Sequence, residues 1–302
     1  MRWLRNAHLE VEVDVELGAE IRVVRRPGGP NVLATYDWVA PVSVRRSTSY
    51  GEQELDWLSD YRGAWQELFP NAGPPCTVDG VPLPFHGEAS RSAWTIVGEG
   101  PVELVLMTPA RLPLVLERRM WLDPDAPVLR IEETVRADAG VRVPFLWGHH
   151  PAFVAAEGAR IDLPAGVQAH VDAGWVAPDG LGDLVPGAEA PWPVVPGRDG
   201  SPVDLSRVPA GPRQRLAFLD VFPDPAWAAV RGVAPGVGVA MAWDRDAFPA
   251  VWNWWEIGGP GHPWHGRARI VAIEPATAWP SDGLAAAAAD GRAHWAEPGR
   301  PV

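Results

Sequence analysis

The feature that most constrains the fold is the strict alternation of apolar and acidic residues in LEVEVDVEL, residues 9–17. Successive side chains of a β-strand point to opposite faces of a sheet. The Leu and Val residues therefore line one face, and the Glu and Asp residues line the other. This pattern predicts a half-buried antiparallel strand. Residues 19–26 are its expected hairpin partner, and the turn sequence PGGPN follows them.

Similar short apolar runs recur along the chain, separated by turn sequences such as DPDAP and PDPAW. The expected strands cover residues 102–107, 112–122, 128–135, 142–147, 236–243 and 267–273. Helical periodicity is scarce, although LAAAAA at residues 284–289 could form one helical turn or a soft tail. Residues 166–213, rich in Pro, Gly and Asp, are expected to form a long excursion with short strands. These features predict an all-β fold, a large antiparallel β-sandwich with one domain over residues 1–302.

Composition excludes several classes of function. The net charge of -12 disfavours nucleic acid and membrane partners, because both present negative surfaces. The chain has no lysine, which rules out a Schiff-base mechanism, and its one cysteine, Cys76, cannot form an internal disulfide or a thiolate metal cluster. The sequence shows no signal peptide and no apolar run of membrane-spanning length, so we expect a cytoplasmic protein.

Two adjacent histidines lie in FLWGHHPAF, residues 145–153. If residues 142–150 form one strand, His149 shares a face with two large aromatic side chains, which indicates packing. His150 points to the opposite face, where Gly148 leaves space for a ligand close to the backbone. His150 is therefore the better candidate for chemistry. The alternative is a structural histidine at the end of a strand.

A carboxylate ends the apolar strand in RIVAIEPATAWP, residues 269–280. Burial would raise the pKa of Glu274 and suit it to general-base catalysis. The alternative is a structural glutamate that caps the following turn or pairs with an arginine.

A long polar and aromatic segment covers residues 61–91 and lacks strand alternation. Its prolines indicate an ordered loop, and its side chains are typical of a binding loop. The alternative is a rigid surface loop. The candidate binding residues in it are Arg62, Trp65, Gln66, Asn71, His86 and Glu88.

Tryptophan is unusually frequent, with 17 residues, and several lie in residues 248–267. Trp252, Trp254, Trp255 and Trp264 could form an aromatic wall for a sugar ring or could belong to the core. His262 and His265 lie in the same segment, but no third metal ligand is clustered with them in the sequence, so we expect no metal site.

Taken together, these segments resemble the aldose 1-epimerase (galactose mutarotase-like) superfamily. The motifs occur in the family's order: FHGE with His86, HPAF with His150 and IEP with Glu274. The resemblance implies a large antiparallel β-supersandwich and a cofactor-free interconversion of the α and β anomers of an aldose. It further implies that Glu274 is the base, that His150 protonates the ring oxygen, and that His86 binds sugar hydroxyls. The resemblance also implies that Arg62 takes the role of the family's substrate-binding arginine, although its motif differs from the usual one. Asp220, in FLDVF, would correspond to a sugar-binding aspartate of the family.

The sequence also departs from the family's pattern. Ala152 stands where an aromatic residue is common, and His149 stands where the family usually has Asn or a similar polar residue. Two alternatives therefore stay open: a carbohydrate-binding protein without turnover, and a sugar-phosphate 1-epimerase that uses Arg62 and Arg91. The expected partner is a small-molecule sugar, and the expected state is a monomer or homodimer.

Overall fold

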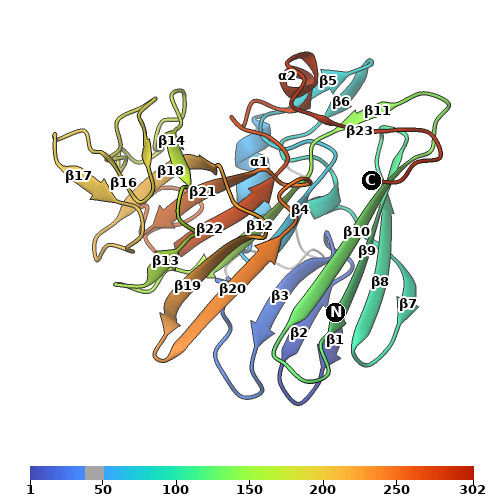
Figure 1. Ribbon diagram of the computed structural model, residues 1–302, viewed down its shortest axis with the longest axis horizontal. Helices are drawn as coiled ribbons and strands as arrows, with labels where there is room; N and C mark the ends of the chain where they lie inside the picture. The colour runs from blue at the N-terminus through green and yellow to red at the C-terminus, as the bar shows by residue number, and fades with distance from the viewer. Residues whose placement is uncertain (38–50) are drawn as a thin grey trace. The chain divides into compact units, whose positions relative to one another are not determined.

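The computed structural model describes residues 1–37 and 51–302 and consists mostly of antiparallel β-strands (Figure 1). The chain forms two compact units. The first comprises Met1–His149 and Ser281–Val302, and the second comprises His150–Pro280. The prediction of an all-β antiparallel fold is confirmed, and the prediction of one domain over residues 1–302 stays a prediction.

The first unit has two main groups of strands. In one, β1 (Arg2–Arg5), β2 (Glu10–Asp14), β3 (Glu20–Arg25) and β4 (Trp65–Leu68) are neighbours in that order. The other is a four-stranded sheet of β10 (Leu129–Ala137), β9 (Leu114–Leu122), β8 (Glu103–Pro109) and β7 (Thr95–Glu99). The smaller elements are α1 (Gln53–Asp60), β5 (Cys76–Val78), β6 (Val81–Leu83), η2 (Ala89–Arg91), β11 (Val143–Phe145), α2 (Leu284–Ala289) and β23 (His294–Ala296).

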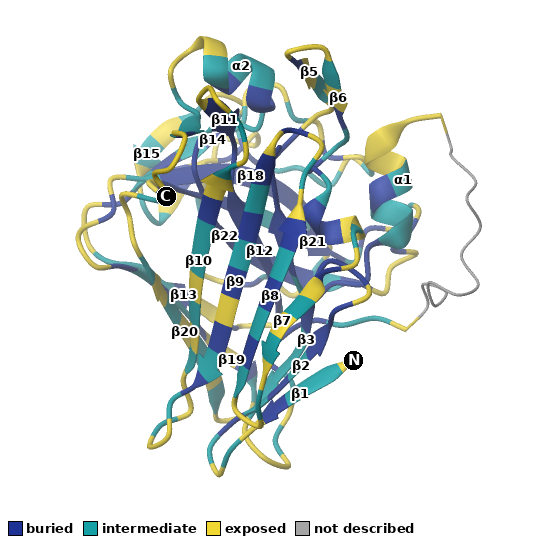
Figure 2. Cartoon of the chain, turned by 90° about the vertical axis from the view of Figure 1, so that its right-hand side faces the viewer, coloured by how far each residue is buried: buried dark blue, intermediate teal, exposed yellow. Residues whose placement is uncertain are grey.

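Strand β2 confirms the reading of the alternating segment, although it is shorter than the pattern. Val11 and Val13 are fully buried, whereas Glu10 and Glu12 are half-exposed. The strand ends at Asp14 because the chain turns there, with the Leu17 N–H donating to the Asp14 carbonyl. Figure 2 shows the same alternation of buried and less buried residues along β9. Period-two burial therefore supplies the core of this unit.

The second unit has one large antiparallel sheet. Its strands are neighbours in the order β12 (Gly148–Val154), β22 (Arg269–Ala276), β21 (Ala250–Ile257), β18 (Arg213–Asp220), β14 (Gln168–Val171) and β15 (Glu189–Pro191). A three-stranded sheet contains β13 (Arg160–Asp162), β19 (Ala226–Ala234) and β20 (Val237–Trp243), and β16 (Val194–Pro196) pairs with β17 (Pro202–Asp204). The excursion at residues 166–213 does carry short strands, as expected. The chain passes from the first unit to the second within β12.

Two local expectations need correction. Residues 142–150 do not form one strand: β11 ends at Phe145, and β12 begins at Gly148. The break is stabilised by the Leu146 N–H, which donates to the Pro70 carbonyl and so leaves the strand ladder. Helix α1 was not expected either, because its eight residues carry only one buried side chain, Trp57. Across residues 1–37 and 51–302, no helix is both long and apolar enough to cross a membrane.

Candidate active site

His150 and Glu274 lie side by side in the second unit, on the neighbouring strands β12 and β22. The His150 Nε2 atom is 3.6 Å from the Glu274 Oε1 atom. Both residues are buried, with exposed fractions of 4% and 2%. A separation of 3.6 Å is too long for a direct hydrogen bond, although it places both groups within reach of one small substrate. The antiparallel sheet thus brings together the two residues that the sequence singles out for chemistry.

Aromatic residues of strand β21 adjoin this His150–Glu274 pair. Trp252 is the cross-strand neighbour of Glu274. The ring of Trp254 lies 5.8 Å from the ring of His150, centre to centre. Trp252, Trp255 and Trp264 are buried, so these three belong to the core, and half-buried Trp254 is the member of the expected aromatic wall that contacts His150.

Burial shifts both groups of the pair towards their neutral forms. It raises the pKa of Glu274 well above its usual value, because an ionised carboxylate loses its hydration there. It lowers the pKa of His150 to about 4 for the corresponding reason. The favoured state is therefore a protonated carboxyl group beside a neutral imidazole. Such a pair has one proton to give and one site that can accept a proton, which suits general acid–base catalysis.

His86 lies in the first unit, in the segment that precedes η2. Its Nδ1 atom accepts a hydrogen bond from the Gly73 N–H at 3.0 Å. The ring packs 4.0 Å from Phe85 and 4.8 Å from Trp57, measured between centres. Its backbone has a φ of 58°, and Gly87 follows at 74°. Glycine is needed at 87 because a Cβ atom there would lie 2.4 Å from the Phe69 carbonyl oxygen. His86 is thus rigidly held, and its sugar-binding role stays a prediction.

Arg62 is the centre of a buried charge cluster in the first unit. One terminal nitrogen, NH2, lies 2.9 Å from Asp14 Oδ2 and 3.4 Å from Glu20 Oε2. Gln66 Nε2 also lies 3.4 Å from that Glu20 oxygen. Among the described residues, the Arg62 Nε and Gln66 Oε1 atoms have no hydrogen-bond partner. The cluster explains why Asp14 is buried on an otherwise alternating strand, and a sugar-binding role for Arg62 and Gln66 stays a prediction.

Asp220 lies at the end of β18 in the second unit. Its Oδ1 atom is 3.0 Å from His170 Nε2, and the His170 ring stacks on Trp279 with centres 4.3 Å apart. His170 was not predicted as a site residue, because a lone histidine in a loop-rich segment carries little signal. The pairing places a charged group beside an aromatic surface. Sugar binding by Asp220 stays a prediction.

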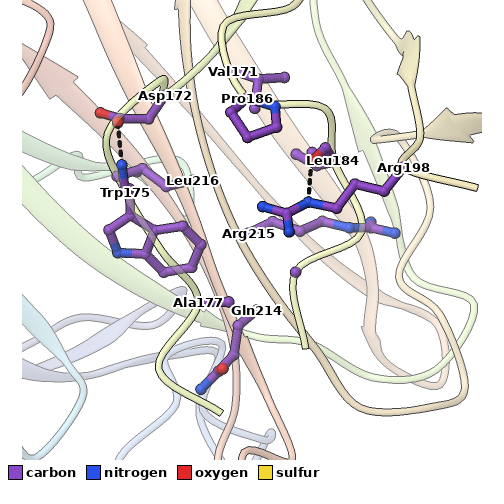
Figure 3. Close-up of a pocket in the computed structure, with 11 residues that line it drawn as sticks. Val171, Asp172, Trp175, Ala177, Leu184, Pro186, Arg198, Gln214, Arg215 and Leu216 are labelled. Atoms are coloured by element: carbon purple, nitrogen blue, oxygen red, sulfur yellow. Dashed lines mark hydrogen bonds between the residues drawn. The ribbon is translucent and has the colours of Figure 1, made fainter. Parts of the chain in front are cut away.

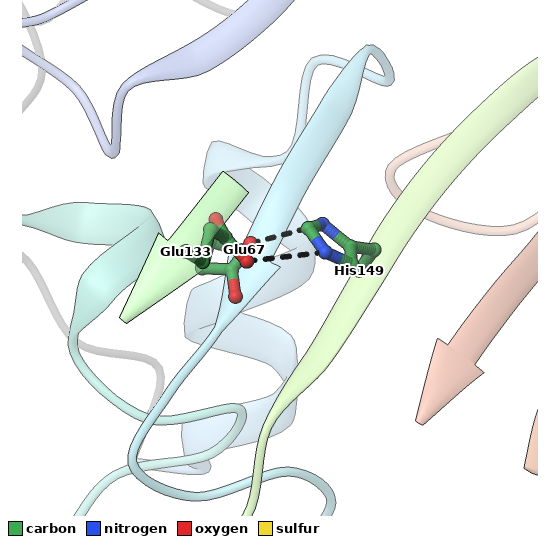
Figure 4. Close-up of side chains that lie close together, drawn as sticks. All are labelled: Glu67, Glu133 and His149. Carbon is green, nitrogen blue, oxygen red and sulfur yellow. Dashed lines mark ion pairs between the residues drawn. The ribbon is translucent and has the colours of Figure 1, made fainter. Parts of the chain in front are cut away.

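A second buried cluster, which we call the charge tetrad, consists of Glu67, Arg118, Glu133 and His149. The Nδ1 atom of His149 lies 3.1 Å from Glu67 Oε2, and its Nε2 atom lies 3.2 Å from Glu133 Oε2 (Figure 4). Arg118 binds both carboxylates, through Nε to Glu133 and through NH2 to Glu67. His149 is therefore part of a charge network, and the expectation that it packs among aromatic residues of its own strand is wrong.

The pKa values of the tetrad indicate a protonated His149 and an ionised Glu133. Burial alone would lower the pKa of His149, but Glu67 and Glu133 outweigh it and raise the pKa to about 10. Burial would raise the pKa of Glu133, but Arg118 and His149 lower it to about 2. Burial and Glu133 together raise the pKa of Glu67, whereas its contacts with His149 and Arg118 lower it.

The tetrad has the residue types of a metal site but does not fit a metal ion. Among the described residues, Glu67, Glu133 and His149 place their ligand atoms within 4.8 Å of one another. However, the Arg118 guanidinium already binds both carboxylates. An imidazole protonated on both nitrogens has no lone pair for a metal. The Trp65 indole nitrogen lies 3.2 Å from His149 Nδ1, and the two rings meet edge to face.

The His149 pKa predicts how stability changes at alkaline pH. Because the folded-state pKa is raised above the unfolded value of 6.5, the stabilisation is fully present below pH 6.5 and is lost as pH rises towards 10. We expect the free energy of unfolding to fall by on the order of a few kcal/mol between pH 6.5 and 10. His149→Gln should lack this component, whereas His8→Gln should keep it. Denaturant unfolding at a series of pH values measures the difference, and equal pH dependence in wild type and His149→Gln would contradict the assignment.

Two surface depressions lie apart from the residues above, one in each unit. A small cavity in the second unit is lined by Trp175, Arg198, Gln214 and Arg215, among others (Figure 3). A broader depression of about 480 Å³ lies in the first unit. Its lining residues include Gly87, Glu88 and Arg91, which come shortly after His86 in the sequence, and Arg111. In the latter, Arg91 pairs with Asp60 and Arg111 pairs with Glu88. Both arginines are thus already matched by carboxylates.

Comparison with known proteins supports the fold. No family model and no curated protein sequence matches the chain. Solved structures match it along its whole length. A galactose mutarotase-like protein from Lactobacillus casei ATCC 334 has 18% identity and a TM-score of 0.66, with 100% of this chain and 97% of that chain covered.

Two further solved structures also match the chain. A galactose mutarotase related enzyme from Lactobacillus acidophilus has 16% identity and a TM-score of 0.62, covering 100% of this chain and 94% of that chain. A protein from Escherichia coli K12 that is provisionally named aldose 1-epimerase has 15% identity and a TM-score of 0.64, covering 99% and 94%. The chain therefore has the galactose mutarotase-like fold, as the sequence resemblance implied.

Proposed function

We propose that the protein is an aldose 1-epimerase that interconverts the α and β anomers of an aldose. The observation that carries this proposal is the buried His150–Glu274 pair, whose nitrogen and oxygen lie 3.6 Å apart in one unit. The fold is that of proteins named as galactose mutarotase-like or as aldose 1-epimerase, which supports a sugar-directed role. Fold alone does not define an activity, so the proposal rests on the pair.

The reaction requires one proton to leave the sugar and one to enter it. Glu274 takes the proton from the anomeric hydroxyl, the C1–O5 bond breaks, C1 becomes an aldehyde, and O5 receives a proton from His150. Rotation about C1–C2 and the reverse proton transfers close the ring as the other anomer. The step starts from an ionised Glu274 and a protonated His150 and ends with the neutral pair that burial favours. Because burial favours the neutral pair before the sugar binds as well, only the fraction of the protein that carries the ionised pair can start this step.

Saturation-transfer NMR of anomer exchange tests the proposal directly. Purified protein is added to a panel of free aldoses and to one hexose 6-phosphate. We expect faster exchange for at least one free aldose. The paired arginines beside Gly87 favour no phosphate site, so the 6-phosphate should not be preferred. Binding without faster exchange would instead indicate a carbohydrate-binding protein, and clear preference for the phosphate would indicate a sugar-phosphate epimerase.

A further inference from the structure

A second buried carboxylate in the second unit, Glu256, has no part in the proposed reaction. It lies on β21, two residues after Trp254, with an exposed fraction of 2%. Its Oε1 atom accepts a hydrogen bond from the Gly259 N–H at 2.8 Å, and its Oε2 atom accepts one from Gln214 Nε2 at 2.7 Å. The side chain therefore joins strand β18 to the segment that follows β21.

Asp179 completes this network from a different loop. Gln214 Nε2 also donates to Asp179 Oδ2 at 2.9 Å, and the Asp179 N–H donates to Gln214 Oε1 at 3.0 Å. The neighbours of Glu256 are thus Gln214 from β18, Ile270 from β22, the Gly259 amide, and the Asp179 carboxylate as the titratable group. The network fixes two loops to the end of the sheet.

The segment that follows β21 packs closely against the Glu256 and Asp179 carboxylates. A Cβ atom at Gly259 would lie 2.5 Å from Glu256 Oε1, and one at Gly261 would lie 2.4 Å from Asp179 Oδ1. The segment also bonds to itself, because the Gly266 N–H donates to the Gly259 carbonyl and the His265 N–H donates to the Gly261 carbonyl. Residues 258–267 therefore form a closed loop whose base is held by the Glu256 carboxylate.

This closed loop supports the candidate active site through two aromatic contacts. Trp264, buried within the loop, lies 5.9 Å from Trp254 between ring centres. Trp254 in turn lies 5.8 Å from His150. We propose that Glu256 is a positioning residue that holds residues 258–267 so that Trp264 supports Trp254 against His150. This inference rests on the proposed function, because positioning has meaning only for a reacting His150.

The state of the carboxylate decides how firmly the loop is held. Ionised Glu256 accepts from both Gly259 and Gln214, whereas a protonated carboxyl group turns one oxygen into a donor and weakens one of these bonds. Burial, opposed by the hydrogen bonds from Gln214 and Gly259, raises the pKa of Glu256 to about 7. The loop should therefore tighten as pH rises through about 7.

The test compares wild type with Glu256→Gln, which keeps the shape but cannot ionise. We expect kcat to fall by about 10- to 100-fold with KM little changed, because a small displacement of a catalytic group costs that much. The ratio of wild-type to variant kcat should grow as pH rises through 7. Glu157→Gln, an exposed carboxylate of the same unit, is the matched control and should behave as wild type. Equal kcat in wild type and Glu256→Gln at every pH would overturn the inference.

A second readout does not depend on activity. The indole N–H signals of Trp254 and Trp264 in NMR spectra should shift with pH near 7 in wild type and should not do so in Glu256→Gln. If wild type proves inactive on every sugar, the proposed function fails, but these signals still decide whether Glu256 controls the loop. If the indole N–H signals of Trp254 and Trp264 change neither with pH nor on substitution of Glu256, the positioning role is wrong.

Discussion

Glu274→Gln is expected to lower the catalysed rate of anomer exchange by about 10²- to 10⁴-fold, the usual contribution of a general acid or base. Glutamine has the shape of glutamate but can neither take up nor release the required proton. The fold should survive, because burial already favours the uncharged form of Glu274 and the substitution removes no buried charge. The measurement is saturation-transfer NMR on the sugar that wild type uses best.

The same experiment needs a control for the loss of a carboxylate. Glu157→Gln changes an exposed carboxylate of the same unit and should keep the wild-type rate. Unfolding curves should show that both variants are folded. A Glu274→Gln variant that exchanges anomers at the wild-type rate would remove Glu274 from the mechanism and leave the buried pair without a catalytic role.

Arg118→Met is expected to lower the free energy of unfolding by about 3–5 kcal/mol, the cost of breaking a buried ion pair by removing one partner. The substitution leaves the carboxylates of Glu67 and Glu133, whose side chains are 0% and 3% exposed, facing His149 alone. Methionine has a similar length and adds no polar group, so the effect should report the lost charge. Chemical denaturation at neutral pH measures it.

The adjacent residue supplies a matched control. Arg119 follows Arg118 on β9 but points outwards, and its side chain is 48% exposed and paired with exposed Glu103. Arg119→Met should change the free energy of unfolding by no more than about 0.5 kcal/mol. The double variant Arg118→Met with Glu133→Gln should recover part of the loss, because one unpaired buried charge is removed. Equal effects of the two single arginine substitutions would contradict a special role for the tetrad.

The sequence predicted the parts of the site that depend on local pattern. Side-chain alternation distinguished His150 from His149, and the position of Glu274 after an apolar run indicated burial. Both features are properties of single strands, so they can be read without knowing which strands are neighbours. The distance between His150 and Glu274 depends on strand order, which local pattern does not determine.

The charge tetrad was missed because its members come from four different strands. A signal was nevertheless present in LVLERRMWL, where Arg118 occupies the same parity as the buried Leu114, Leu116 and Met120. A charged residue on an apolar face requires a partner of opposite charge. Glu133 is its direct cross-strand neighbour on β10. Glu256 was also missed. It lies in WNWWEI, where the tryptophans indicate an aromatic strand and the single carboxylate carries no signal of its own.

The two neighbouring histidines of β12 show how tightly the length of this strand is constrained. His149 is held as a cation with a pKa of about 10, and His150 as a neutral ring with a pKa of about 4. The two side chains are identical, but the pleat of the backbone points them to opposite faces of the strand. Their different surroundings therefore set their different charge states. A slip of one residue would exchange their surroundings, since alternation reverses every side chain. Insertions or deletions within Gly148–Val154 should therefore be far less tolerable than substitutions of its apolar residues.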